Sequence, residues 1–246
     1  MKKIFLGFSA LAATLVALPM FAAFEAHVVN VTATIENALF VHPQSLEYGT
    51  VFPQEHLESS FFIAFSDSFS VKSQTRVGKV DYVIKQKPEP QDSFLAQVGV
   101  EPARDYCENN APTNGGDPND PYYAKCHANL CPYLSKEPDN IPSTGVSANN
   151  DVGLPPFHDP LTQFAKGTLV KFANSNSTSS VGNDPSDTWT VDLAVPCFTG
   201  QCAQDWPAFV HGLNPAADPA QYTLPPTLEH QIFGCDLWVE VTKIYR

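Results

Sequence analysis

The sequence has 246 residues, a formal net charge of −12 at pH 7 and six cysteines. An acidic chain of this kind does not suit nucleic acid or anionic lipid as a partner, and its surplus of Asp and Glu favours solubility or cation binding. Residues 24–246 are enough for one large β domain, or for one domain that carries a long insertion.

The first 23 residues have the features of an export signal. Lys2 and Lys3 precede an apolar run from Ile4 to about Ala23, and the run ends on small residues. This pattern is typical of a cleaved signal peptide. A retained membrane anchor is the alternative, because the run approaches the roughly 20 residues that span a bilayer. We therefore expect a secreted or cell-surface protein that contacts a membrane only through an uncleaved signal.

A strand-like segment, Ala26–Asn37, follows the signal with no linker between them. Apolar and polar side chains alternate along it, so an extended chain has one apolar row. That row consists of Val29, Val31, Ala33 and Ile35. The segment can join the sheet of its own chain or pair with a neighbouring subunit, and the pattern leaves both alternatives open.

Further strands are predicted wherever short aromatic and β-branched stretches are bounded by polar or turn residues. They are Ser45–Phe52, Ser60–Phe65, Lys79–Lys85, Gly167–Phe172, Asp187–Val195 and Cys235–Tyr245. A single helical turn is expected at Leu161–Lys166, and no stretch has a helical period over three turns. The pattern predicts an all-β fold, an antiparallel two-sheet sandwich of the jelly-roll or immunoglobulin-like kind, forming one domain over residues 24–246.

The character of the sequence changes between Pro88 and Pro160, a stretch that holds 12 of the 22 prolines. Proline removes backbone donors, and the Asn-Gly-Gly-Asp-Pro run from Asn114 favours turns, so regular structure is not expected here. Three of the cysteines fall within the stretch. We interpret it as an irregular insertion, about 88–160, that disulfides hold on the surface of the domain.

An even number of cysteines in an exported chain favours disulfide bonds. The six are Cys107, Cys126, Cys131, Cys197, Cys202 and Cys235, and their spacing does not fix which pairs with which. The two Cys-x4-Cys pairs are also compatible with a four-thiolate zinc site. An oxidising compartment favours the disulfides.

Candidate metal ligands gather in the insertion at Asp117, Asn119 and Asp120, with Asp105 and Glu108 upstream. These side chains offer the hard oxygen ligands that calcium takes. The EF-hand order is missing, and turn formation explains the Asp and Asn residues equally well. Calcium is therefore the one cofactor that the sequence suggests.

No catalytic residue is assigned, because the chain has no zinc-protease, serine-hydrolase or phosphate-binding motif. We therefore expect a protein that is not an enzyme. Among the tryptophans, Trp189 and Trp238 lie in predicted strands and are expected in the core. Trp206 lies in a predicted loop and is the one expected to be exposed.

The first part of the chain also contains recognisable segments. They are Leu46-Glu-Tyr-Gly-Thr-Val-Phe-Pro-Gln54, the aromatic strand Phe61–Phe65, and Phe65-Ser-Asp-Ser-Phe69. Over about the first 70 residues the chain resembles the camelysin and TasA-type group of exported biofilm-fibre proteins. Its Cys131–Ser135 and Cys235–Glu240 segments also resemble those of a set of uncharacterised secreted bacterial proteins.

The resemblance to the fibre group implies a jelly-roll-like sandwich whose subunits join when an N-terminal strand enters the groove of the next subunit. The row at Val29, Val31, Ala33 and Ile35 would then fill pockets of the acceptor. Head-to-tail donation that does not close gives a filament of one protein. The expected function is an exported structural subunit of an extracellular filament or biofilm matrix. The alternative is a monomeric secreted or cell-surface binding module that uses the 88–160 insertion.

Overall fold

The computed structural model describes residues 37–71, 76–112, 117, 119–131, 133–136, 153–158, 163–171 and 185–246. The chain divides into two units, Met1–Glu36 and Asn37–Arg246. All the elements described below belong to the second unit.

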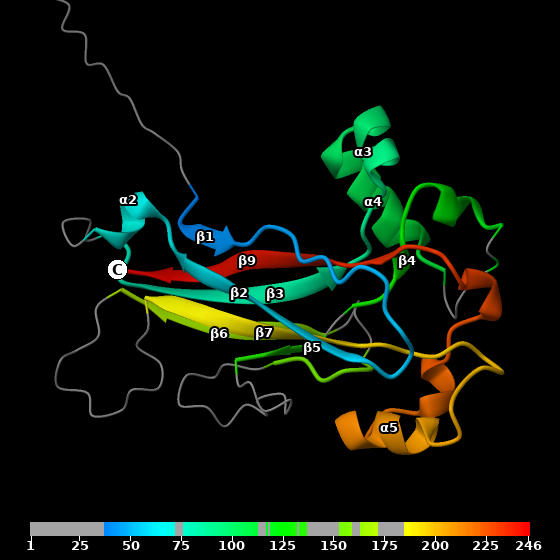
Figure 1. Cartoon of the computed structure of the whole chain (residues 1–246). Helices are drawn as coiled ribbons and strands as arrows, with labels where there is room; N and C mark the ends of the chain where they lie inside the picture. The colour runs from blue at the N-terminus through cyan, green and yellow to red at the C-terminus, as the bar shows by residue number, and fades with distance from the viewer. Residues whose placement is uncertain are drawn as a thin grey trace, which may run out of the picture. The chain divides into compact units, whose positions relative to one another are not determined.

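Two antiparallel sheets contain most of the strands (Figure 1). The first has the strand order β1-β2-β7-β5, formed by Leu39–His42, His56–Phe65, Ser186–Ala194 and Tyr133–Ser135. The second has the order β6-β3-β9, formed by Phe164–Val170, Lys79–Lys87 and Asp236–Tyr245. A short parallel ladder joins β4 (Ala128–Asn129) to β8 (Phe233–Gly234). The mostly-β fold predicted from the alternating pattern is confirmed.

One hydrophobic core takes side chains from both of these sheets. The first sheet contributes Phe61, Ile63, Phe65, Leu134, Trp189 and Val191, and the second contributes Val80, Tyr82, Ile84, Ala165 and Leu169. Along β2, β3 and β7 these residues occupy alternate positions, so each strand turns one row inward. Fully burying a Val, Leu, Ile or Phe side chain stabilises a fold by about 1.5–3 kcal/mol.

Buried polar side chains also connect the two sheets. The Tyr82 hydroxyl donates to Asp187 Oδ2 at 2.5 Å, and Trp189 Nε1 donates to the Tyr82 hydroxyl at 2.8 Å. The ammonium of Lys136 lies 2.7 Å from Asp187 Oδ1. Gly167 makes room for this arrangement, because a Cβ there would lie 2.2 Å from the Tyr82 ring. A tyrosine of one sheet is thus bonded to an aspartate of the other.

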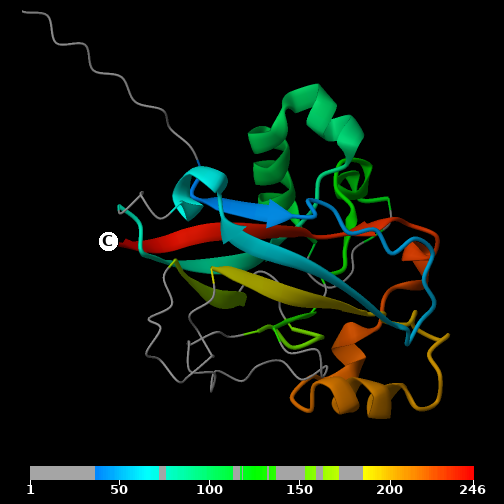
Figure 2. The same ribbon diagram turned by 60° about the vertical axis from the view of Figure 1, so that its left-hand side comes forward.

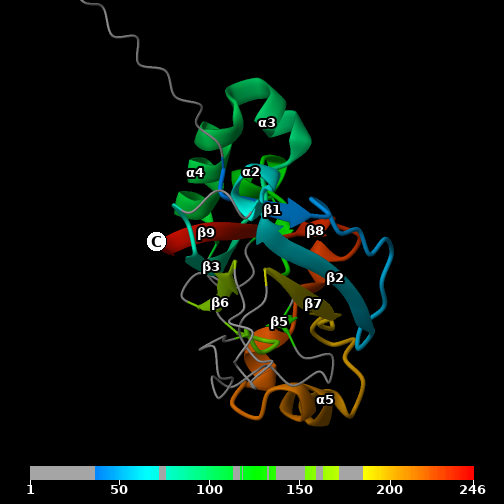
Figure 3. The same ribbon diagram turned by 90° about the vertical axis from the view of Figure 1, so that its left-hand side faces the viewer.

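Helices occur in two regions that the sequence analysis expected to be irregular. Inside the insertion lie α3 (Asp92–Val98) and α4 (Val100–Asn110), and α5 (Trp206–Leu213) lies in the region of Trp206 that was predicted as a loop. The prediction of irregular chain is wrong there, because Pro102 and Pro207 occupy first helical turns, where a missing N–H removes no hydrogen bond. Figure 3 shows α3 and α4 on one side of the sheets and α5 on the opposite side.

Shorter helical elements complete the described chain. They are α2 (Asp67–Ser70) and the 3-10 turns η1 (Pro121–Ala124), η2 (Pro219–Tyr222) and η3 (Pro226–Leu228). None of the helices among the described residues is long and apolar enough to cross a bilayer.

Two predicted elements differ from the structure. Ser45–Phe52 is not a strand, although Leu46 and Tyr48 pack against the core. Its extended path is interrupted at Gly49, whose φ of 70° lies in the left-handed region. The helical turn expected at Leu161–Lys166 is also wrong where the chain is described, because Phe164 already begins β6.

All six cysteines, each of them among the described residues, form disulfides. The pairs are Cys107–Cys126, Cys131–Cys235 and Cys197–Cys202. The prediction of disulfides is confirmed and the zinc alternative is excluded, because no thiolate remains to bind a metal. Cys131–Cys235 ties the insertion to the residue before β9. Three disulfides suit an oxidising, extracellular environment.

Candidate functional site

The predicted donor row, Val29, Val31, Ala33 and Ile35, lies outside the described residues. Asn37, the first residue that the structure describes, lies two residues before β1. β1 is an edge strand of its sheet and pairs with β2 through Leu39 to His42. In the sequence, the segment that carries the predicted donor row therefore comes shortly before an edge strand.

A second sheet edge is formed by β9. This strand pairs with β3 along one side, and within the described part of the chain no strand pairs with its other side. Figures 1 and 2 show β9 and β1, the edge strands of the two sheets, at the same margin of the molecule. An edge of this kind presents backbone N–H and C=O groups that another strand can bond.

The core-facing side of β9 is covered along only part of its length. Leu237 and Val239 pack against the core. Val241 and Ile244 are 41% and 52% exposed, although they lie directly opposite Tyr82 and Val80 of β3. Directly opposed residues of an antiparallel pair point to the same face of the sheet.

The two β3 partners are almost completely buried, Tyr82 at 1% exposure and Val80 at 0%. The inner face of β9 thus has two apolar side chains that nothing in the described chain covers fully. We call Val241 and Ile244 the uncovered row.

A β-bulge places Ile244 in this row. The register between β3 and β9 shifts between Asp81 and Tyr82, so one residue of β9, Thr242, has no opposite partner. Strict alternation from Leu237 puts Val241 on the inner face but Ile244 on the outer face. The extra residue shifts the alternation by one position, so the residues after Thr242 point to the opposite faces of the sheet, and Ile244 lies on the inner face. The alternation of the β9 sequence alone therefore indicates Val241 as inward and does not reveal Ile244.

An exposed aromatic cluster lies on the other face of the β1–β2 edge. The ring of Phe40 has its centroid 6.1 Å from that of His42 and 5.9 Å from that of Phe62. Phe40 is 47% exposed. The edge therefore presents apolar surface on its outer face as well as a strand that another chain can pair with.

The predicted calcium ligands serve as turn formers where the structure describes them. Asp117 Oδ1 accepts hydrogen bonds from the backbone N–H and side-chain amide of Asn119, each at 2.9 Å. Asp120 caps η1 by accepting from the backbone N–H of Tyr122. Glu108, upstream, pairs with Lys87 at 2.5 Å. Among the described residues no group of three or more His, Cys, Asp or Glu side chains could hold a metal ion.

The burial of the three tryptophans differs in part from the sequence prediction. Trp189 is fully buried in the core, as predicted. Trp206 is buried at 4% exposure, so its predicted exposure is wrong, because α5 turns its ring onto Phe157 and Phe209. The prediction that Trp238 lies in the core is wrong, because it lies on the outer face of β9, opposite Lys85. The ammonium of Lys87 lies 4.0 Å from its ring centroid.

Burial raises the pKa of one tyrosine, Tyr48, near the β2–β7 pair. The Tyr48 hydroxyl donates to the backbone oxygen of Val191 at 3.0 Å. Burial, with the nearby charges of Asp192 and Glu58, raises the pKa of Tyr48 to about 12. The phenol therefore stays protonated and acts as a structural donor that holds the 43–55 segment to β7.

The chain was also compared with known proteins. No family model, curated protein or solved structure matches it.

Proposed function

We propose that the protein is an exported structural subunit of an extracellular filament or matrix, a two-sheet β-sandwich that assembles when its N-terminal strand enters the next subunit. The acceptor in this proposal is the edge of β9. The observation that carries it is the uncovered row, because Val241 and Ile244 face the core side of the sheet and remain exposed.

The physical basis is β-augmentation. A donated strand forms main-chain hydrogen bonds with the free edge of β9, while alternate side chains fill the space over the uncovered row. The donor row of Val29, Val31, Ala33 and Ile35 has the two-residue spacing that this geometry needs. Each fully buried Val or Ile side chain contributes about 1.5–3 kcal/mol to such a joint. The three disulfides brace the subunit against unfolding while the joint forms.

Negative-stain microscopy of residues 24–246 beside a chain that starts at Asn37 tests the proposal. We expect filaments from the longer chain and folded monomers from the shorter one. The alternation supplies a matched pair of variants: Val29→Asp with Val31→Asp should abolish filaments, whereas Asn30→Asp with Thr32→Asp should leave them. Uniform small particles in every sample would refute the proposal.

Mixing two assembly-deficient chains tests the acceptor directly. The chain starting at Asn37 keeps its acceptor but lacks the donor, and a full mature chain with Val241→Asp and Ile244→Asp keeps the donor but lacks the acceptor. Each should be monomeric alone, and together they should form one-to-one dimers in size-exclusion chromatography with light scattering. The control variant is Ile232→Asp, which changes an apolar residue outside the acceptor that is 72% exposed, and it should still form filaments.

Calcium enters the proposal as a bracing ion for the 117–120 turn. Filament samples with and without calcium test this, together with Asp117→Asn and Asp120→Asn. A shift of the unfolding midpoint on adding calcium that is lost in these variants would support it. Equal midpoints with and without the ion would remove calcium from the proposal.

A further inference from the structure

A pocket with a volume of about 290 Å³ opens between the insertion and the segment before β8, beside the Cys107–Cys126 disulfide. It lies between the start of α3, the chain from η1 to β4, and the segment before β8. The lining side chains that matter here are Asp92, Ser93, Tyr123, His127, Gln231 and Ile232. Its volume is near the lower end of the about 300–1,000 Å³ typical of small-molecule sites, so its ligand is small.

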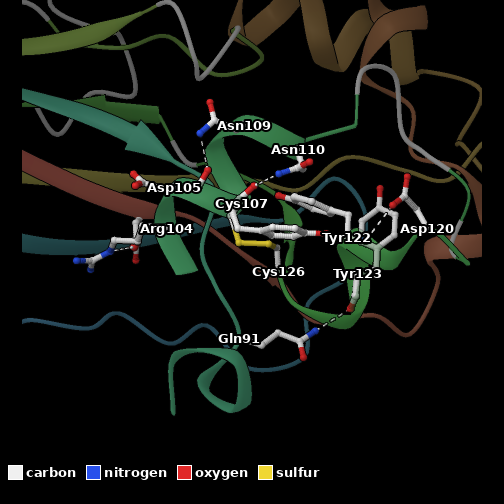
Figure 4. The surroundings of a disulfide bond; sticks show 12 residues. Gln91, Arg104, Asp105, Cys107, Asn109, Asn110, Asp120, Tyr122, Tyr123 and Cys126 are labelled. Atoms are coloured by element: carbon white, nitrogen blue, oxygen red, sulfur yellow. Dashed lines mark hydrogen bonds and ion pairs between the residues drawn. A yellow bond between two sulfur atoms is a disulfide. The ribbon is translucent and has the colours of Figure 1, made fainter. Parts of the chain in front are cut away.

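The walls of the pocket are held by several independent bonds. Gln91 Nε2 donates to the backbone oxygen of Tyr123 at 2.8 Å (Figure 4). The backbone N–H of Gln91 donates to the backbone oxygen of Lys125. The His127 backbone N–H donates to the backbone oxygen of Glu89. Cys126 is fixed to α4 by its disulfide with Cys107. A site braced in this way loses little entropy when a ligand binds.

Four polar side chains line this pocket and form no hydrogen bond or ion pair within the described chain: Asp92, Ser93, His127 and Gln231. Together they offer a carboxylate, a hydroxyl, an imidazole and an amide around one pocket. Ile232 adds an apolar wall that is 72% exposed, and Tyr123 adds an aromatic residue. A few convergent polar groups beside an apolar surface are typical of small-molecule sites.

The charges around the pocket restrict the ligand. Asp92 lines it, and Glu89 lies close enough to interact electrostatically with both Asp92 and His127. Burial raises the pKa of Glu89, and the charges of Asp236 and Asp92 add to this effect, against the opposing influence of His127. An anionic ligand would meet the Asp92 carboxylate and be repelled, whereas a neutral or amine-bearing ligand would not.

We propose that this pocket binds a single neutral or amine-bearing pyranose ring of a polysaccharide. A pyranose carries several hydroxyl groups that both donate and accept, which suits the four unbonded polar side chains. Its C–H face suits the apolar wall of Ile232 and Tyr123. The site goes beyond the assembly proposed above, because it would attach each subunit to glycan whether or not the subunit forms filaments.

Saturation-transfer NMR on the mature chain, residues 24–246, tests the inference with methyl glycosides of glucose, galactose, mannose, N-acetylglucosamine and glucosamine, and with glucuronate as the anionic probe. We expect transfer to at least one of the first five and none to glucuronate. A monosaccharide contacting so few groups should bind with a Kd on the order of 1 mM.

Two exposed residues provide variants that preserve folding. Asp92→Ala and Gln231→Ala remove side chains that make no bond within the described chain, so the unfolding midpoint should not change, while sugar affinity should fall at least tenfold. Asp105→Ala and His211→Ala, at exposed residues away from the pocket, should bind as the unaltered chain does. Asp92→Lys replaces the carboxylate in the pocket by an ammonium and should allow glucuronate to bind.

The outcomes separate this inference from the proposed function. Absence of transfer to all five sugars, equal transfer in the Asp92→Ala chain, or a preference of the unaltered chain for glucuronate would each overturn the pyranose site. A chain that binds the sugar but never forms filaments would leave the site standing and refute the filament subunit. A chain that forms filaments but binds no sugar would support the filament subunit and overturn the pyranose site.

Discussion

Removing the three disulfides one at a time should destabilise the protein in the order of the lengths of the loops that they close. Cys131–Cys235 spans 104 residues, Cys107–Cys126 spans 19 and Cys197–Cys202 spans 5. In the chain-entropy relation the cost of losing a bridge grows with the logarithm of loop length. It gives about 4.7 kcal/mol for the longest loop, about 3.2 for the middle one and about 2.1 for the shortest.

The measurement uses paired Cys→Ala variants, so that no unpaired thiol remains to exchange. Alanine is chosen because Cys107, Cys126 and Cys197 are fully buried, and a serine hydroxyl there would need a hydrogen-bond partner. For a domain of this size, 1 kcal/mol lowers the melting temperature by about 2–4 °C. Calorimetry should therefore show a drop of about 9–19 °C without Cys131–Cys235 and of about 4–8 °C without Cys197–Cys202.

The order of the three effects is the decisive result. If the Cys197→Ala/Cys202→Ala chain loses as much stability as the Cys131→Ala/Cys235→Ala chain, loop closure does not control the contribution of these bridges. A Cys131→Ala/Cys235→Ala chain that melts like the unaltered protein would also show that the insertion folds independently of its tie to β9.

Three further predictions concern buried groups. Asp187→Ala leaves the Lys136 ammonium without its carboxylate and should cost about 3–5 kcal/mol in thermal unfolding. Gly167→Ala places a methyl group on the Tyr82 ring and should cost about 1–3 kcal/mol, whereas equal stability would mean that the ring moves freely. Burial raises the pKa of Glu89, so the folded chain holds that proton more tightly, and the associated stability is present at acid pH and lost as the pH rises through the folded pKa. Glu89→Gln should therefore unfold at a higher denaturant concentration than the unaltered chain at pH 7 but not at pH 3, and the opposite pattern would contradict the shift.

Strands with a regular inner row could be predicted from sequence because their period is visible in a single segment. Phe61, Ile63 and Phe65 alternate in β2, and Trp189, Val191 and Leu193 alternate in β7. The helices could not be predicted in the same way. In α3 and α4 the proline-rich surroundings outweighed a short helical pattern, and a proline in the first turn does not end a helix.

The candidate acceptor shows a different limit of sequence reasoning. Ile244 reaches the inner face through the extra residue at Thr242, and a bulge depends on the partner strand, which no single segment reveals. The exposure of Val241 and Ile244 also depends on what the opposite sheet leaves uncovered. The disulfide pairs were equally inaccessible, because they depend on distances between segments far apart in the sequence.

The bridge between Cys131 and Cys235 imposes an order on biogenesis. A chain made from its N-terminus exposes Cys107, Cys126 and Cys131 well before Cys235 exists, and Cys131 lies only five residues beyond Cys126. Either of these two thiols can attack a bond formed by the other with Cys107. Cys131 must therefore remain reduced, or be released by exchange, until Cys235 has been synthesised. Efficient production of the native protein should depend on a thiol–disulfide isomerase, and a chain truncated before Cys235 should collect mispaired forms.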